Sequence, residues 1–204
     1  MSRIPNRIAT VAAVLSGAAL LLAATDGMRA FTAEGARRLD IARQPRPVPH
    51  ALLEDAAGHE WSSAELRGRT ALVGFVYTEC GTLCPRLSSR FAELQQGIRE
   101  RRLSERVRLL SVSFDPERDT PERLEEYARH FAAEPGLWHF ARMRAAPALR
   151  SWLSVFGIVV IPDARGGFEH NAAIHVVDPS GRLVAVFDPD DIDAALRAAA
   201  EQGS

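Results

Sequence analysis

Cys80 and Cys84 are the only cysteines in this chain of 204 residues. They lie in the segment Cys-Gly-Thr-Leu-Cys-Pro, with three residues between them. Thiolates are soft ligands that suit Cu(I) and Zn, and they are also the nucleophiles of disulfide exchange. A structural disulfide between cysteines so close in sequence would constrain the unfolded chain very little. The pair therefore indicates either metal binding or redox chemistry.

The cysteines fall between an expected strand and an expected helix. The apolar run Ala71–Thr78 predicts a buried strand that ends just before Cys80. Pro85 suits the first position of a helix that is expected to run to Arg102. Because backbone N–H groups at a helix start favour negative charge, Cys84 is expected to ionise more easily than a free thiol.

Six histidines are available as a third ligand. His170 follows two glycines and is expected to open the strand beside the cysteine strand, where its imidazole could reach both sulfur atoms. Two thiolates and one imidazole form a low-coordination set that suits copper. His175 is out of phase with the apolar positions of its strand and is expected to face solvent or a helix in a structural role. The remaining histidines are also expected to be structural: His50, His59, His130 and His139.

Strands and helices alternate along the chain, which predicts an α/β sheet. Ligands bind outside the carboxyl ends of the strands in such sheets, so Cys80, Cys84 and Asp115 should share one edge. A short hairpin is expected at 52–61, a helical turn at 63–66 and a glycine-rich loop at 166–170. Further strands are expected at 107–114, 137–141, 172–177 and 182–187, and further helices at 121–131, 147–156 and 190–201.

The amino-terminal segment indicates export. Arg3 and Arg7 precede an uncharged run of 18 residues, Ile8–Thr25, which is long for a signal-peptide core and short for a membrane-spanning helix. An uncleaved anchor is favoured over a cleaved signal, for which Thr25-Asp26-Gly27 is the best cleavage site. Residues 1–27 are predicted as this segment, 28–47 as an extended connector with prolines, and 48–204 as the folded domain. The net charge of −1 implies no nucleic-acid partner.

Three motifs together resemble the Sco/SenC family of copper-binding, thioredoxin-like proteins. They are Tyr77-Thr-Glu-Cys-Gly-Thr-Leu-Cys-Pro85, Asp115-Pro-Glu-Arg-Asp-Thr-Pro121, and His170 placed before Asp178-Pro-Ser-Gly181. The resemblance spans about Val48 to the carboxyl terminus. It implies a thioredoxin-like sheet flanked by helices, an amino-terminal anchor helix, and copper ligands at Cys80, Cys84 and His170.

The chain departs from the usual family pattern at three positions. Glu169 stands where the family commonly has an aspartate before the ligand histidine. Gly81 stands where a proline usually follows the first cysteine, and His175 occupies a position that is usually apolar or aromatic. These differences leave the three ligands in place and affect only what can be expected of copper affinity and partner choice.

The resemblance implies a copper chaperone that delivers Cu(I), Cu(II) or both to the dinuclear copper site of cytochrome c oxidase during its assembly. Its partners would be the oxidase copper-site subunit, other periplasmic copper carriers or thiol oxidoreductases, and the membrane through the amino-terminal segment. The domain would face the periplasm from the inner membrane, or be secreted to the periplasm after signal cleavage.

A second function stays open, that of a thiol–disulfide oxidoreductase in which Cys80 and Cys84 form the redox pair. Such a protein would keep the cysteines of the oxidase copper site reduced. Thioredoxin-type enzymes typically have Cys-x-x-Cys and a cis proline at the facing strand, whereas here the spacing is one residue longer and His170 lies near that place. This favours metal. A third function, that of a thiol peroxidase, is suggested by Thr78 and Gly81 and ranks last.

Asp115 could either orient the site or open the turn before the next helix. The role in the turn is slightly favoured.

Overall fold

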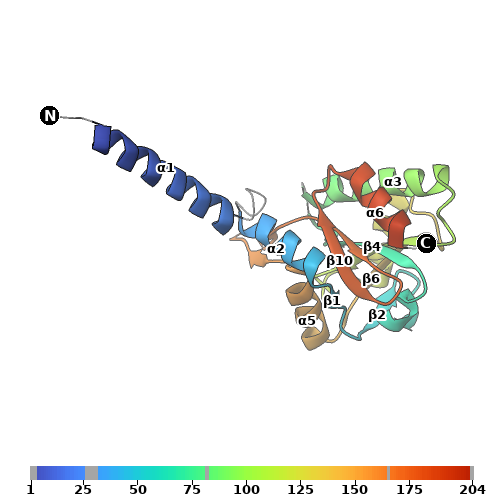
Figure 1. Ribbon diagram of the computed structural model, residues 1–204. Coiled ribbons are helices and arrows are strands. Elements are labelled where there is room, and N and C mark those ends of the chain that lie inside the picture. The colour runs from blue at the N-terminus through green and yellow to red at the C-terminus, as the bar shows by residue number, and fades with distance from the viewer. Residues whose placement is uncertain (1–3, 26–31, 81–82, 165, 203–204) are drawn as a thin grey trace. The chain divides into compact units, whose positions relative to one another are not determined.

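The strand that leads to Cys80 lies near the centre of a mixed sheet in the computed structural model (Figure 1). The structure describes residues 4–25, 32–80, 83–164 and 166–202. The chain divides into two units, residues 1–43 and residues 44–204. The sheet and the candidate site both belong to the second unit.

Eight strands form the main sheet, in the order β1-β10-β9-β4-β5-β6-β2-β3. The strands β4, β5 and β6 are parallel, and β9 pairs with β4 in antiparallel orientation. All seven residues of β4 are buried, as expected for a strand that is covered on both faces. The strands are β1 (Arg46–Pro47), β2 (Leu52–Asp55), β3 (Glu60–Ser62), β4 (Thr70–Val76), β5 (Val107–Ser113), β6 (Trp138–Arg142), β9 (Ile174–Val177) and β10 (Arg182–Phe187).

Helices cover both faces of this sheet. Gly74 of β4 faces the ring of Phe91 in α3, whereas the next residue, Phe75, packs edge-to-face on Phe156 of α5 with 5.1 Å between ring centroids. Because successive side chains of a strand point to opposite faces, α3 and α5 lie on opposite sides of the sheet. The helices of this unit are α3 (Leu83–Glu100), α4 (Pro121–His130), α5 (Ala146–Phe156) and α6 (Ile192–Gln202), with a 3₁₀ turn at Ser63–Leu66.

The predicted α/β sheet flanked by helices is confirmed, and most element ends shift by only one or two residues. The start of α4 matches its prediction at the level of single atoms. The Thr120 hydroxyl accepts a hydrogen bond from the backbone N–H of Arg123, and Pro121 occupies the first turn. A hydroxyl acceptor and a proline at these positions are the standard features that begin a helix.

The prediction of an extended connector at 28–47 is wrong over much of its length. Residues Ala33–Arg43 form a helix, α2, in the first unit, which also contains α1 (Ile4–Ala24). The carboxylate of Glu34 bonds to the guanidinium groups of Arg37 and Arg38, one turn further along α2. Pairs with this spacing support a helix, and the hydrogen bonds from these two arginines lower the pKa of Glu34 to about 2.

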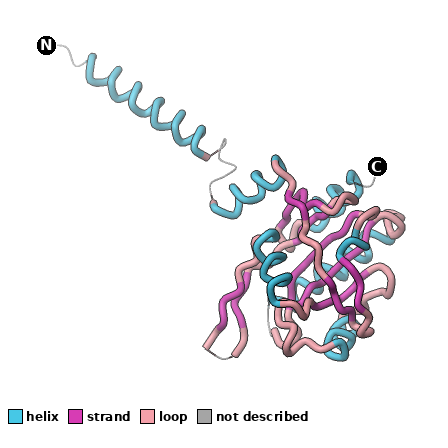
Figure 2. The backbone as a smooth tube through the Cα atoms, turned by 90° about the horizontal axis from the view of Figure 1, so that it is seen from below, coloured by secondary structure: helices cyan, strands magenta, loops and turns pink. Residues whose placement is uncertain are grey.

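Two other predicted boundaries are also corrected. The helix after the cysteines begins at Leu83, so Pro85 is its third residue and Cys84 lies inside its first turn. The expected loop at 166–170 contains a strand, β8 (Phe168–His170), which pairs with β7 (Val160–Pro162) in a separate hairpin. Figure 2 shows this hairpin extending away from the sheet. His170 therefore ends a short strand and does not begin β9.

Among the residues that the structure describes, no helix is both long enough and apolar enough to cross a membrane. The anchor expected within residues 1–27 stays a prediction. Asp26 and Gly27, which belong to the candidate cleavage site, lie outside the described residues.

Candidate metal centre

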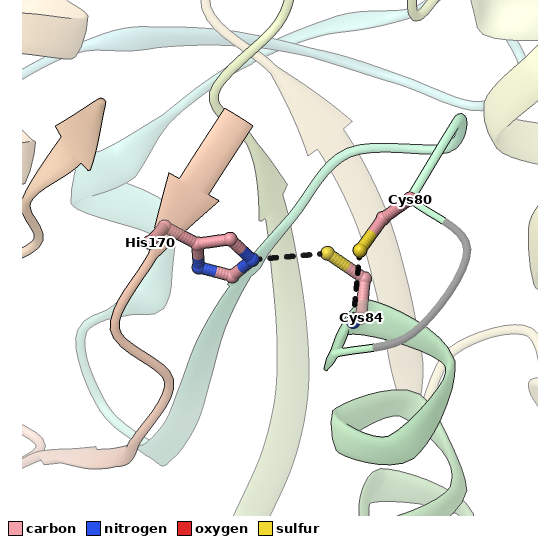
Figure 3. A group of neighbouring side chains, drawn as sticks. All are labelled: Cys80, Cys84 and His170. Atoms are coloured by element: carbon pink, nitrogen blue, oxygen red, sulfur yellow. Dashed lines mark hydrogen bonds between the residues drawn. The ribbon is translucent and has the colours of Figure 1, made fainter. Parts of the chain in front are cut away.

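The structure brings together the three side chains that the sequence singled out. The sulfur atoms of Cys80 and Cys84 and a ring nitrogen of His170 all lie within 4.8 Å of one another (Figure 3). Both cysteines are buried free thiols. In the described part of the chain, this is the only group of three or more Cys, His, Asp or Glu side chains that is arranged to hold a metal ion.

Three separate elements supply these candidate ligands. Cys80 follows the carboxyl end of β4, Cys84 lies in the first turn of α3, and His170 ends β8. The backbone N–H of Cys84 donates to the sulfur of Cys80 at 3.2 Å, which ties the helix start to the preceding loop. Gly81, where the chain departs from the family pattern, lies between the cysteines and outside the described residues.

Each ring nitrogen of His170 has one polar contact, and together these two contacts fix the orientation of the ring. Its Nδ1 lies 3.0 Å from the backbone oxygen of Asn171, and its Nε2 lies 3.2 Å from the sulfur of Cys84. A carbonyl oxygen can only accept a hydrogen bond, so Nδ1 carries the proton. Burial lowers the pKa of His170 and so favours the neutral ring. The lone pair of Nε2 therefore points at the thiols, as a metal ligand requires.

The prediction that Cys84 ionises more easily than a free thiol is wrong. Cys84 has no exposed surface, and burial raises the pKa of its thiol well above the ordinary value, with the neighbouring Cys80 acting in the same direction. The favourable N–H groups of the first turn of α3 do not offset this cost of desolvation. A bound cation would reverse the balance, because a metal ion stabilises the thiolate that binds it.

A pocket of about 650 Å³ opens beside the site and is lined by Cys80 and His170 but not by Cys84. Its walls include aromatic side chains and several charged ones. Phe114, which does not line the pocket, packs edge-to-face on the ring of His170, with 4.8 Å between centroids. Further lining residues are Tyr77, Glu79, Leu83, Arg118, Asp163, Phe168 and Glu169. Two ligands are thus accessible from the pocket, and the third is covered.

Asn171 is a residue that sequence reasoning missed. Its side-chain oxygen accepts the N–H of Val159 at 2.8 Å, and its side-chain nitrogen donates to the oxygen of Gly157 at 3.0 Å. These bonds close the base of the β7–β8 hairpin, while the backbone oxygen of Asn171 holds the ring of His170. The only sequence signal was a polar residue directly after the candidate histidine.

His175 lies in the core and outside the group formed by Cys80, Cys84 and His170, as expected of a structural residue. It has no exposed surface and faces α5, where its ring packs edge-to-face on Phe156 at 5.2 Å. Its Nδ1 lies 3.1 Å from the oxygen of Val73, and its Nε2 lies 3.1 Å from the oxygen of Phe156. Of the two surroundings left open by the sequence, helix or solvent, the structure shows the helix.

Asp115 follows β5 at the same edge of the sheet as Cys80, but it is not part of the ligand group. Its backbone oxygen accepts the N–H groups of Arg118 and Asp119, which closes the turn before α4. Its carboxylate pairs with Arg118, which in turn reaches Glu79 at the rim of the pocket. These contacts agree with the role that the sequence slightly favoured for Asp115, which is to open the turn before α4.

The family model described as SCO1/SenC matches residues 49–202. This chain belongs to the SCO1/SenC family. The match includes every strand of the sheet except β1, the hairpin that carries His170, and both cysteines. The predicted family is therefore confirmed, and the resemblance noted in the motifs extends over nearly all of the second unit.

Relatives with similar sequences include proteins from Bacillus and Rickettsia. The chain is 26% identical to a SCO1 protein homolog of Bacillus subtilis over 133 residues, which cover 64% of this chain and 68% of that protein. It is 32% identical to a SCO2-like protein of Rickettsia felis over 79 residues, covering 39% and 38%. The alignment with this second relative thus covers little more than a third of either chain.

Solved structures confirm the thioredoxin-like fold of the family for this chain. A SCO1/SenC family lipoprotein from Bacillus anthracis superposes with a TM-score of 0.72 at 20% identity, over 79% of this chain and 99% of that one. Arabidopsis thaliana ScoI, solved with copper bound, gives a TM-score of 0.65 at 20% identity, covering 76% and 96%. The apo Sco1 protein of Thermus thermophilus gives 0.59 at 29% identity, covering 78% and 91%.

Proposed function

We propose that this protein is a copper chaperone that holds one copper ion through the sulfurs of Cys80 and Cys84 and through Nε2 of His170. The observation that carries the proposal is the convergence of these three atoms within 4.8 Å, with the His170 lone pair already directed at the thiols. Two thiolates and one imidazole suit copper, and the number of ligands is low enough for the ion to leave again. Copper-bound structures of the family support this choice of metal.

The shape of the site favours transfer by ligand exchange. Cys80 and His170 line the pocket, so the ligands of an approaching partner can reach the metal from their side. Cys84 is covered and would release the ion last. A carrier that keeps one covered ligand holds its ion until the partner has supplied new ones, which prevents loss of free copper to solvent.

The proposed recipient is the dinuclear copper site of cytochrome c oxidase. BsSco, which is described as a member of the Sco family of cytochrome c oxidase assembly proteins, has the same fold with a TM-score of 0.69. We place the domain in the periplasm, held at the inner membrane or secreted, because the arginines and the apolar run at the amino terminus indicate export. Other copper carriers and thiol oxidoreductases of that compartment would be further partners.

Copper titration of the reduced protein tests the proposal. We expect one copper ion per chain, and Cu(II) bound in this way should show a sulfur-to-copper charge-transfer band. The variant with both Cys80→Ser and Cys84→Ser should lose the band and the tight Cu(I) binding measured by competition with a chelator. Equal Cu(I) affinity for the wild type and this double variant, with no band in either, would refute the chaperone function.

The second candidate is a thiol–disulfide oxidoreductase that keeps the copper-site cysteines of the oxidase reduced. The observation that favours it is the bond from the Cys84 N–H to the sulfur of Cys80, since such a donor stabilises a thiolate. BsSco is also described as having a disulfide switch. In this mechanism one thiolate attacks the disulfide of the partner, the other thiol resolves the mixed disulfide, and the partner leaves as a dithiol.

A further inference from the structure

Asp119 is a fully buried carboxylate that the proposed copper chemistry does not use. It lies in the turn between β5 and α4 and has no exposed surface. Its Oδ1 accepts the hydroxyl of Thr78 at 2.6 Å and the backbone N–H of Thr78 at 3.1 Å. Its Oδ2 accepts the hydroxyl of Ser113. A buried carboxylate is costly unless donors satisfy it, and here two of the three donors belong to one residue.

That residue stands directly before the site. Thr78 follows the end of β4 and lies two positions before Cys80, on the segment that connects β4 with α3. The neighbouring Glu79 also bonds to α4, through the guanidinium of Arg123 at 2.6 Å. The segment that carries Cys80 is therefore held from the side of the β5–α4 turn, whereas Cys84 is held by α3 itself.

We propose that Asp119 is a positioning residue for the copper site, which fixes Thr78 and thereby holds Cys80 at the distance from Cys84 and His170 that a shared copper ion needs. This inference rests on the proposed copper function. Hydrogen bonds to a carboxylate are about twice as strong as those between neutral groups, so the contact with Asp119 can hold Thr78 firmly in place. Residues that orient metal ligands typically contribute about 10–100-fold to metal affinity.

The test compares two substitutions of the same kind, one just after the end of β4 and one at its beginning. Thr78→Val removes the hydroxyl that donates to Asp119 and leaves the carboxylate, Ser113 and the ligands in place. Thr70→Val is the matched control at the other end of β4. Thr70 is buried, whereas Thr78 is partly exposed, and the hydroxyl of Thr70 has no hydrogen-bond partner in the described part of the chain. Both variants keep the shape of the side chain, and Thr78→Ser restores the hydroxyl as a conservative rescue.

Two properties of the full-length protein are measured. The first is the Cu(I) affinity in competition with a chelator, and we expect Thr78→Val to lose about tenfold or more relative to Thr70→Val. The second is the alkylation rate of the reduced, copper-free thiols by iodoacetamide. Buried thiols react when the segment opens locally, so loss of a bond to a charged acceptor should raise this rate about tenfold or more. Thr78→Ser should behave as the wild type in both.

The two measurements distinguish the positioning role of Asp119 from the proposed copper function. Equal alkylation rates for Thr78→Val and Thr70→Val would overturn the inference, whatever copper does. Faster alkylation with unchanged Cu(I) affinity would overturn the positioning role, because the loosened segment would then not matter to the metal. Absence of copper binding by the wild type would instead overturn the proposed function, and with it the claim that Asp119 positions a residue of a copper site. Because Thr78→Val removes a bond of the folded state, its denaturant midpoint should also fall. Alkylation that rises with urea as steeply as global unfolding does would show that the thiols react only from the unfolded chain, and this would also overturn the inference.

Discussion

At the scale of single residues, two nearby histidines have opposite roles that follow from what surrounds them. His170 keeps one ring nitrogen for the thiols, because only its Nδ1 is held by a backbone oxygen. Both nitrogens of His175 lie against backbone oxygens, those of Val73 and Phe156, in the core. Because both ring nitrogens of His175 face backbone oxygens, neither of them is directed at the candidate metal site.

Replacing each histidine by alanine should therefore affect different properties. We expect His170→Ala to lower copper affinity by more than about 100-fold, since a direct ligand should matter more than a residue that only orients one. Its free energy of unfolding should change little, because the ring lies at the edge of the pocket. Chelator competition and urea denaturation measure the two quantities.

The matching change, His175→Ala, should have the reverse effect. It removes a buried ring together with its contacts to two backbone oxygens, which should lower the free energy of unfolding by about 2–4 kcal/mol. Copper affinity of the folded protein should stay close to that of the wild type.

Full oxidase assembly with His170→Ala at limiting copper would favour the thiol reductant over the chaperone. Selective loss of copper binding in His175→Ala would mean that the ligand has been assigned to the wrong histidine.

At the scale of elements, the site depends on the spacing between β4 and α3, which carry the two cysteines. Gly74 sets this spacing, because a Cβ atom added there would lie 2.7 Å from the ring of Phe91. Phe91 cannot move away easily, since it is buried and packs against Trp138 with 5.9 Å between ring centroids. The glycine thus lets the helix approach the strand closely enough to bring Cys84 beside Cys80.

Gly74→Ala should disturb this approach and lower the free energy of unfolding by about 1–3 kcal/mol, as is usual for overpacked cores. Copper affinity should fall as well, because α3 must shift relative to β4. Combining Gly74→Ala with Phe91→Leu should recover part of both losses by making room for the added methyl group. Additive losses in the double variant, measured by urea denaturation, would show that the contact with Phe91 is not the cause.

At the scale of the whole molecule, the folded second unit follows a first unit that contains α1 and α2. The proposed oxidase partner and the proposed copper exchange both require the second unit to lie outside the cytoplasm. The amino-terminal arginines and the apolar run of 18 residues carry this expectation.

A reporter enzyme that needs disulfide bonds for its activity, fused after Ser204, should therefore be active in cells. Deleting residues 1–27 should abolish this activity. Cell fractionation of the same fusion should distinguish an anchored protein from one released into the periplasm. Activity of a reporter that works only in the cytoplasm would contradict export and, with it, the proposed delivery of copper to the oxidase.

The sequence by itself determined the candidate site and the class of the fold. Cys80 and Cys84 were recognisable because they are the only thiols and lie between a strand pattern and a helix pattern. The order of strands and helices followed from hydrophobic periodicity, which is a local property of the chain. The start of α4 followed from Thr120 and Pro121, because capping depends on neighbours only a few residues away.

Only the tertiary structure decided how these parts act on one another. The thiol pKa of Cys84 depends on burial by distant segments, and this outweighs the local effect of the helix start from which the opposite shift was predicted. The proton position on His170 depends on its contact with a backbone oxygen, and the surroundings of His175 depend on α5 packing over β9. The bonds from Asp119 to Thr78 join residues 41 positions apart. Long-range packing and burial leave no periodic signal in a sequence, so these properties of the site appear only when the chain is folded.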